Sequence, residues 1–145
     1  MRRDFLVAGA LFVASFGMAR AKRQSPPEKP KDPQVATEEY KIPQADADKK
    51  NPVKPTAEGL AAARKVYGYD CEMCHGAKGN GKGDIVDSMQ LTMHDWHDAA
   101  SLAGKTDGEL FYIITKGKGK MMGEGDRVPN TMRWNLVNLV RSYSK

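Results

Sequence analysis

Cys71-Glu72-Met73-Cys74-His75 is the most informative motif in this chain. It has the C-x-x-C-H spacing of a covalent haem attachment site. Each thiol adds to one vinyl group of the porphyrin, and a gap of two residues lets both sulfurs reach the same face of the ring. The adjacent histidine then lies under the iron, where its imidazole nitrogen can bind the metal. We therefore predict one covalently bound haem c, an iron cofactor, attached through Cys71 and Cys74 and ligated by His75.

Other uses of two cysteines fit this pattern less well. A redox-active C-x-x-C would follow a strand in a βαβ unit, whereas this motif follows a helical pattern. A zinc site would need more ligands at suitable spacing, and the chain offers no other cysteine and only His94 and His97 as further histidines. A simple disulfide is compatible with an exported chain, but it gives no reason for the adjacent histidine.

The N-terminus has the three parts of a secretion signal. Arg2 and Arg3 form a basic start, residues 5–18 are apolar, and Ala19-Arg20-Ala21 places small residues where a signal peptidase cleaves. We predict that residues 1–21 are a signal peptide and that the protein is exported, with the periplasm as the expected compartment. The apolar stretch is shorter than the ~20 residues that span a bilayer, so no membrane span is expected in the mature chain. The alternative is an uncleaved signal that keeps the protein at the membrane.

Residues 22–56 contain seven of the eight prolines, many charges and almost no large apolar side chains. Such a segment buries too little apolar surface to offset its ordering entropy. We predict a flexible linker over residues 22–56 and a folded domain over residues 57–145.

Three helical patterns lie in the predicted domain. Thr56 is a candidate N-cap for a helix that runs into the cysteine motif, and Thr106 with Glu109 forms a capping box for a second helix. A strand is the alternative for residues 111–115, because several of them are β-branched. Pro129 begins a third helix with one apolar stripe, flanked by Trp134. Three main helices with long loops form a thin core, which a buried haem would stabilise. The predicted fold class is therefore all-α.

The net charge of +5 does not indicate nucleic acid binding. Residues 57–145 carry twelve basic and eleven acidic residues, so most of the excess belongs to the N-terminal segments. A nearly neutral domain is not expected to bind phosphates over an extended surface.

Residues 57–145 resemble the small class I c-type cytochromes, a family of monohaem proteins. The resemblance rests on Tyr67, on Cys71-Glu72-Met73-Cys74-His75-Gly76, on Gly79-Asn80-Gly81-Lys82-Gly83, and on a late methionine flanked by glycines before a terminal helix with Trp134. It implies a fold of about three helices and long loops wrapped around one haem. Where the family often places a glycine and an aromatic at the crossing of the first and last helices, this chain has Ala63 and Leu139. The family's usual proline carbonyl acceptor for the axial histidine is also missing, and a carbonyl near residues 90–93 is expected to replace it.

The resemblance also implies a methionine as the second axial ligand, on the loop before the last helix. Met121 and Met122 lie there, and the family's usual Met-Pro pair aligns Met121 with the ligand and Met122 with the proline. Met73 is pinned between the two cysteines, and Met132 lies on a helix stripe. Met122 is the alternative ligand, and His94 or His97 would instead give a bis-histidine haem.

Two occupied axial positions leave no open site for a substrate, so we expect an electron carrier and not an enzyme. The expected partners are redox proteins or respiratory complexes. Lys116, Lys118 and Lys120 adjoin the predicted ligand loop and would favour acidic docking surfaces. One alternative is a haem module of a larger respiratory complex. Another is a haem enzyme or gas sensor with a displaceable distal ligand.

Overall fold

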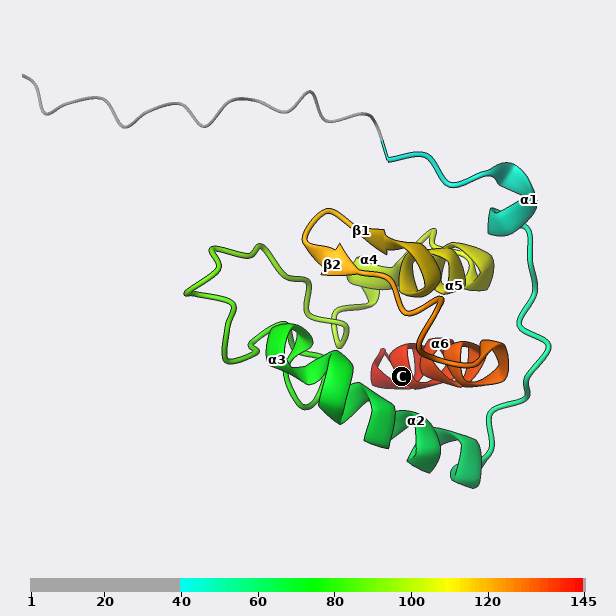
Figure 1. Cartoon of the computed structure of the whole chain (residues 1–145), viewed down its shortest axis with the longest axis horizontal. Coiled ribbons are helices and arrows are strands. Elements are labelled where there is room, and N and C mark those ends of the chain that lie inside the picture. Colours follow the sequence, from blue (N-terminus) through cyan, green and yellow to red (C-terminus); the bar gives the residue numbers. More distant parts are fainter. Residues whose placement is uncertain (1–39, 145) are drawn as a thin grey trace, which may run out of the picture. The chain divides into compact units, whose positions relative to one another are not determined.

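The computed structural model describes residues 40–144. The predicted signal peptide and residues 22–39 of the predicted linker lie outside this range. Within it the elements are mainly helices, with one short hairpin between the last two. In chain order they are α1 (Gln44–Ala47), α2 (Ala57–Asp70), α3 (Glu72–His75), α4 (Ala99–Leu102), α5 (Asp107–Lys116), β1 (Gly117–Lys118), β2 (Met121–Met122) and α6 (Asn130–Tyr143). The all-α prediction is confirmed, with α2, α5 and α6 as the three longer helices (Figure 1).

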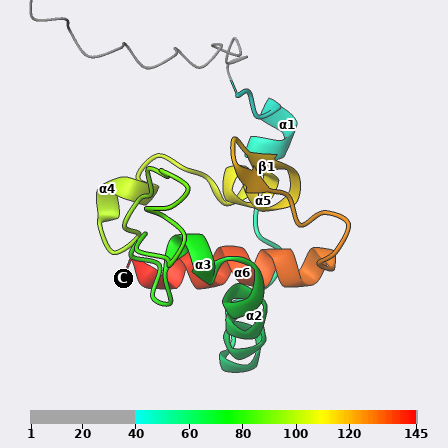
Figure 2. The same ribbon diagram turned by 60° about the vertical axis from the view of Figure 1, so that its left-hand side comes forward.

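Helices α2 and α6 cross near the centre of the domain (Figure 2). The side chain of Thr56 accepts a hydrogen bond from the Gly59 N–H at 3.0 Å, as predicted for an N-cap. Ala63 and Leu139 are both fully buried in one apolar cluster with Tyr67 and Leu136. A small residue on α2 and a larger one on α6 therefore share one buried cluster, an exchange that can conserve the packed volume.

Helix α5 begins with the predicted capping box. The Thr106 side chain accepts from the Glu109 N–H at 3.1 Å, and the Glu109 carboxylate accepts from the Thr106 N–H at 2.7 Å. Residues 111–115 are helical, so the strand alternative is wrong. The Trp134 ring is only 6% exposed and stacks on Phe111 at a centroid distance of 3.9 Å. Trp134 thus belongs to the core between α5 and α6, whereas the sequence placed it beside the apolar stripe.

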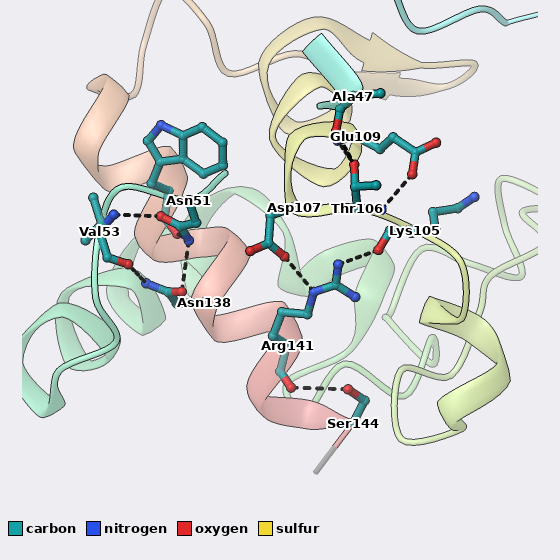
Figure 3. Close-up of polar contacts among 11 residues, drawn as sticks. Ala47, Asn51, Val53, Lys105, Thr106, Asp107, Glu109, Asn138, Arg141 and Ser144 are labelled. Carbon is teal, nitrogen blue, oxygen red and sulfur yellow. Dashed lines mark hydrogen bonds and ion pairs between the residues drawn. The ribbon is translucent and has the colours of Figure 1, made fainter. Parts of the chain in front are cut away.

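Part of the segment that was predicted to be a linker contacts the domain. Residues 40–56 pack onto the domain instead of forming a free spacer, and Val53 contributes to its second apolar cluster. Asn51 donates to the backbone of Trp134 and to Asn138, and the Asn138 amide donates to the Val53 carbonyl at 2.9 Å (Figure 3). Hydrogen bonds to specific partners hold this segment, and little apolar surface is buried. Amino-acid composition alone therefore does not reveal that the segment is ordered.

A hairpin of two strands, each two residues long, follows α5 directly. Its strands are antiparallel, with Gly117 paired with Met122 and Lys118 with Met121. Gly117 has φ +80°, and its N–H donates to the Ile113 carbonyl, so it closes α5. The loop on which Met121 and Met122 were expected is therefore a short hairpin at the end of α5.

Candidate haem site

The attachment motif begins at Cys71, the residue that joins α2 to α3, and continues through α3 to His75. The Cys71 N–H still donates to the Tyr67 carbonyl at 2.9 Å, and the His75 N–H donates to the Cys71 carbonyl at 2.9 Å. Gly76 then ends α3 with φ +74°, a conformation that favours glycine. One short helical turn thus brings Cys71, Cys74 and His75 together, as the spacing predicted.

Both thiols of the motif are free and partly buried. Burial, followed by the nearby Glu124 and Asp70 carboxylates, raises the pKa of Cys71 to about 12. This is the opposite of the lowered pKa that activates the cysteine of a redox C-x-x-C. The environment of Cys71 therefore argues against dithiol redox chemistry.

The His75 imidazole is partly buried, and this burial lowers its pKa to about 4. The ring is therefore neutral at pH 7, which is the form that binds a metal. Its Nδ1 atom is buried and has no hydrogen-bond partner among residues 40–144. The expected carbonyl acceptor near residues 90–93 is thus not engaged.

Aromatic rings surround His75 from distant parts of the sequence. The Trp96 indole stacks on the imidazole, with centroids 4.4 Å apart and an angle of 23°, and the Tyr143 ring stacks on Trp96 at 6.1 Å. Tyr67 contacts both Trp96 and Tyr143. Trp96 lies in the loop between α3 and α4, and nothing near it in the sequence indicates that it reaches the histidine.

The glycine-rich loop after His75 packs closely onto the motif. The Tyr67 hydroxyl donates to the Gly76 carbonyl at 2.7 Å, and the Gly81 N–H donates to the His75 carbonyl at 2.8 Å. A Cβ atom on Gly83 would lie 2.2 Å from the Met73 carbonyl oxygen, so only glycine fits there. These contacts fix the backbone that carries both thiols and the imidazole.

The two candidate distal methionines differ in exposure. Met121 is partly buried, whereas Met122 is 75% exposed. Met73 is also exposed. His94 and His97 lie on the surface, and His97 Nδ1 contacts the Asp95 carboxylate at 2.8 Å.

These residues fit a haem c. The free thiols of Cys71 and Cys74 can form thioethers, and the neutral, partly buried imidazole of His75 can ligate iron. No group of three or more His, Cys, Asp or Glu side chains within residues 40–144 could hold a metal ion by itself.

Comparison with known proteins identifies the family. Residues 58–140, more than half of the chain, match the sequence model of the family described as cytochrome c oxidase, cbb3-type, subunit III. The chain belongs to this family of c-type cytochromes. The resemblance to class I c-type cytochromes is thereby confirmed, and haem-based electron transfer is the activity of such a domain.

Two solved structures are similar to this cytochrome. The KustC0563 c-type cytochrome is 26% identical with a TM-score of 0.50, and the match covers 57% of this chain and 98% of that one. A chain of the Kuenenia stuttgartiensis reducing HAO-like protein complex Kustc0457/Kustc0458 is 22% identical with a TM-score of 0.54, and the match covers 65% of this chain and 47% of that one. At this level of identity, the similarity to the second structure shows a shared fold and nothing further. No curated protein sequence matches the cytochrome.

Proposed function

We propose that this cytochrome is an exported electron carrier with one covalently bound haem c, ligated by His75 and Met121. The observation that carries the proposal is the single turn holding two free thiols and a partly buried, neutral imidazole. One C-x-x-C-H motif in 145 residues supports one haem. The haem supplies the redox-active iron, and the chain supplies its attachment and surroundings.

Met121 is the proposed distal ligand because of its position and its burial. It lies on the hairpin before α6, and its partial burial contrasts with the exposed Met122. A thioether is a soft, neutral ligand that favours ferrous over ferric iron and so raises the potential. Both axial positions are then filled, which supports a carrier and not an enzyme.

Acidic redox proteins are the proposed partners. Lys116, Lys118 and Lys120 are exposed on and beside the hairpin. Positive charge next to the distal ligand would attract acidic surfaces and speed encounter. Such electron-transfer contacts are small and short-lived.

The decisive experiment combines a pyridine haemochrome spectrum with the intact mass of the exported holoprotein. We expect a c-type spectrum, a mass increase of one haem that survives denaturation and acid–organic extraction, and loss of residues 1–21. A haem that extracts freely, or a mass without haem, would refute covalent attachment. The same mass measurement decides whether the signal is cleaved.

A haem module of a larger complex is the second candidate function. The family description names an oxidase subunit, and one similar fold comes from a redox complex. No helix within residues 40–144 is long and apolar enough to cross a bilayer. Copurification of the cytochrome with a membrane complex from its source would favour the module over a free shuttle. Rapid carbon monoxide binding by the ferrous protein would instead favour an enzyme or gas sensor.

A further inference from the structure

Tyr40 connects the N-terminal strap, defined here as residues 40–55, to the hairpin that carries Met121. Its hydroxyl donates a hydrogen bond to the Gly117 carbonyl at 2.8 Å. The Lys118 Nζ lies 5.3 Å from the centroid of the Tyr40 ring, within the range of a cation–π contact. The ring also meets Tyr112 of α5 edge to face at 6.4 Å. Tyr40 therefore contacts both strand residues of β1 and the helix before it.

Gly117 is the first residue of the hairpin and directly follows the last residue of α5. Its φ of +80° directs the chain out of α5, and a Cβ atom there would lie 2.3 Å from the Met121 carbonyl oxygen. The backbone of Met121 thus packs directly against the residue that Tyr40 holds. A shift of Gly117 would move the proposed ligand with it.

The second strand of the hairpin is held differently. After β2 the Glu124 N–H donates to the Ile114 carbonyl at 2.8 Å, and the Gly125 N–H donates to the Thr115 carbonyl at 3.0 Å. These bonds satisfy the last carbonyls of α5 and fix the exit of the hairpin. The first strand is instead held at Gly117 by the hydrogen bond from Tyr40 of the strap.

The strap is itself anchored at the start of α5. The Thr106 hydroxyl donates to the Ala47 carbonyl (Figure 3), and a Cβ atom on Gly108 would lie 2.1 Å from the Asp46 carbonyl oxygen. The carbonyls of α1 therefore pack against Gly108, where any larger residue would clash with them. The strap thus contacts the N-terminal end of α5 through α1 and its C-terminal end through Tyr40.

We propose that Tyr40 is a positioning residue for the distal ligand, holding the hairpin so that Met121 stays on the iron. This inference rests on the proposed function, because it takes Met121 as the ligand. A ligand loop that is pre-organised by outside contacts opens less often. Losing a neutral hydrogen bond of about 1 kcal/mol corresponds to about a fivefold larger open population.

The test measures imidazole binding to the ferric holoprotein, since external imidazole binds only when Met121 has left the iron. Tyr40→Phe, which removes one hydroxyl, should raise imidazole affinity about fivefold while the far-red band of Met-ligated ferric haem persists without imidazole. Gly108→Ala, which displaces the strap at its other end, should change the affinity in the same direction.

Two control variants match these changes. Tyr69→Phe also removes one phenol hydroxyl, from a side chain that is 82% exposed. Gly68→Ala adds a methyl group in α2, where the nearest neighbour outside the helix backbone is a flexible Glu72 side chain at 3.6 Å. Both should leave imidazole affinity unchanged. Equal increases in all four variants would mean general destabilisation and would overturn the proposal.

Failure of the inference is distinguishable from failure of the proposed function. If Met121→Ala raises imidazole affinity but Tyr40→Phe changes it less than twofold, Tyr40 does not position the ligand. If the wild-type protein lacks the far-red band, or Met121→Ala leaves imidazole affinity unchanged, Met121 is not the ligand and both proposals fall.

Discussion

Replacing Met121 and Met122 one at a time by alanine separates an iron ligand from its surface neighbour. Loss of the Met121 thioether removes a soft, neutral ligand that favours ferrous iron, so the reduction potential should fall. The far-red band of the ferric protein should disappear, and the ferrous iron should open to carbon monoxide. Met122→Ala should preserve all three properties.

The structure also sets the expected effect on stability. Met122 is 75% exposed, so only about a quarter of its surface leaves water on folding. Full burial of a methionine side chain contributes roughly 1.5–3 kcal/mol, so Met122→Ala should lower the free energy of unfolding by less than about 1 kcal/mol. A fully buried methionine would instead cost about 2–5 kcal/mol on truncation.

Redox titration, absorption spectra and denaturant unfolding of the two holoproteins provide the comparison. The variants must be measured side by side, because a small shift of the hairpin would let one methionine replace the other. If Met122→Ala loses the band and Met121→Ala keeps it, the ligand is Met122. If the wild type and both variants lack the band and His94→Ala or His97→Ala changes the spectrum, the haem is bis-histidine and the reasoning from exposure and position fails.

Three further predictions concern attachment, docking and the motif's support. Exchanging both Cys71 and Cys74 for alanine should remove covalent haem and leave a poorly folded domain, since the core is thin; mass spectrometry and thermal circular dichroism check this. Tyr67→Phe removes the 2.7 Å hydrogen bond to the Gly76 carbonyl and should lower the free energy of unfolding by about 1–3 kcal/mol, measured with denaturant. Electron transfer to an acidic partner should slow as salt rises, and stopped-flow rates should lose that dependence when three lysines become glutamine: Lys116, Lys118 and Lys120.

Each of these predictions has a contrary outcome. A compact apoprotein that unfolds cooperatively would contradict the need for haem in the core. Unchanged stability of Tyr67→Phe would mean that water replaces the lost bond without cost. The lysine variant should be compared with one that removes the same charge from exposed lysines elsewhere: Lys50, Lys54 and Lys65. Equal flattening of the salt dependence in both variants would attribute it to net charge and not to the hairpin.

The local elements could be predicted because their signals lie within a few residues. Thr56 and the Thr106–Glu109 box mark helix starts through side-chain bonds to nearby N–H groups, and Gly117 marks a helix end through its positive φ. The C-x-x-C-H spacing likewise places three functional side chains on one turn. In each case short-range stereochemistry determines the outcome.

Contacts between distant segments could not be predicted in the same way. Trp96 reaches His75 only because the loop after α3 folds back onto the motif, and Trp134 is buried only because α5 packs over it. The strap was mistaken for linker because its hydrogen bonds from Tyr40 and Asn51 go to partners more than 70 residues away. Neither composition nor periodicity carries information about such pairs.

The sequence alone therefore indicated a c-type cytochrome, its three longer helices and the two candidate distal methionines. The packing of the chain shows which methionine is exposed, which aromatic ring stacks on the histidine, and which part of the predicted linker contacts the domain. This division arises because attachment motifs and helix caps depend on neighbours along the chain. Burial and stacking depend on neighbours in space, which only the packed chain brings together.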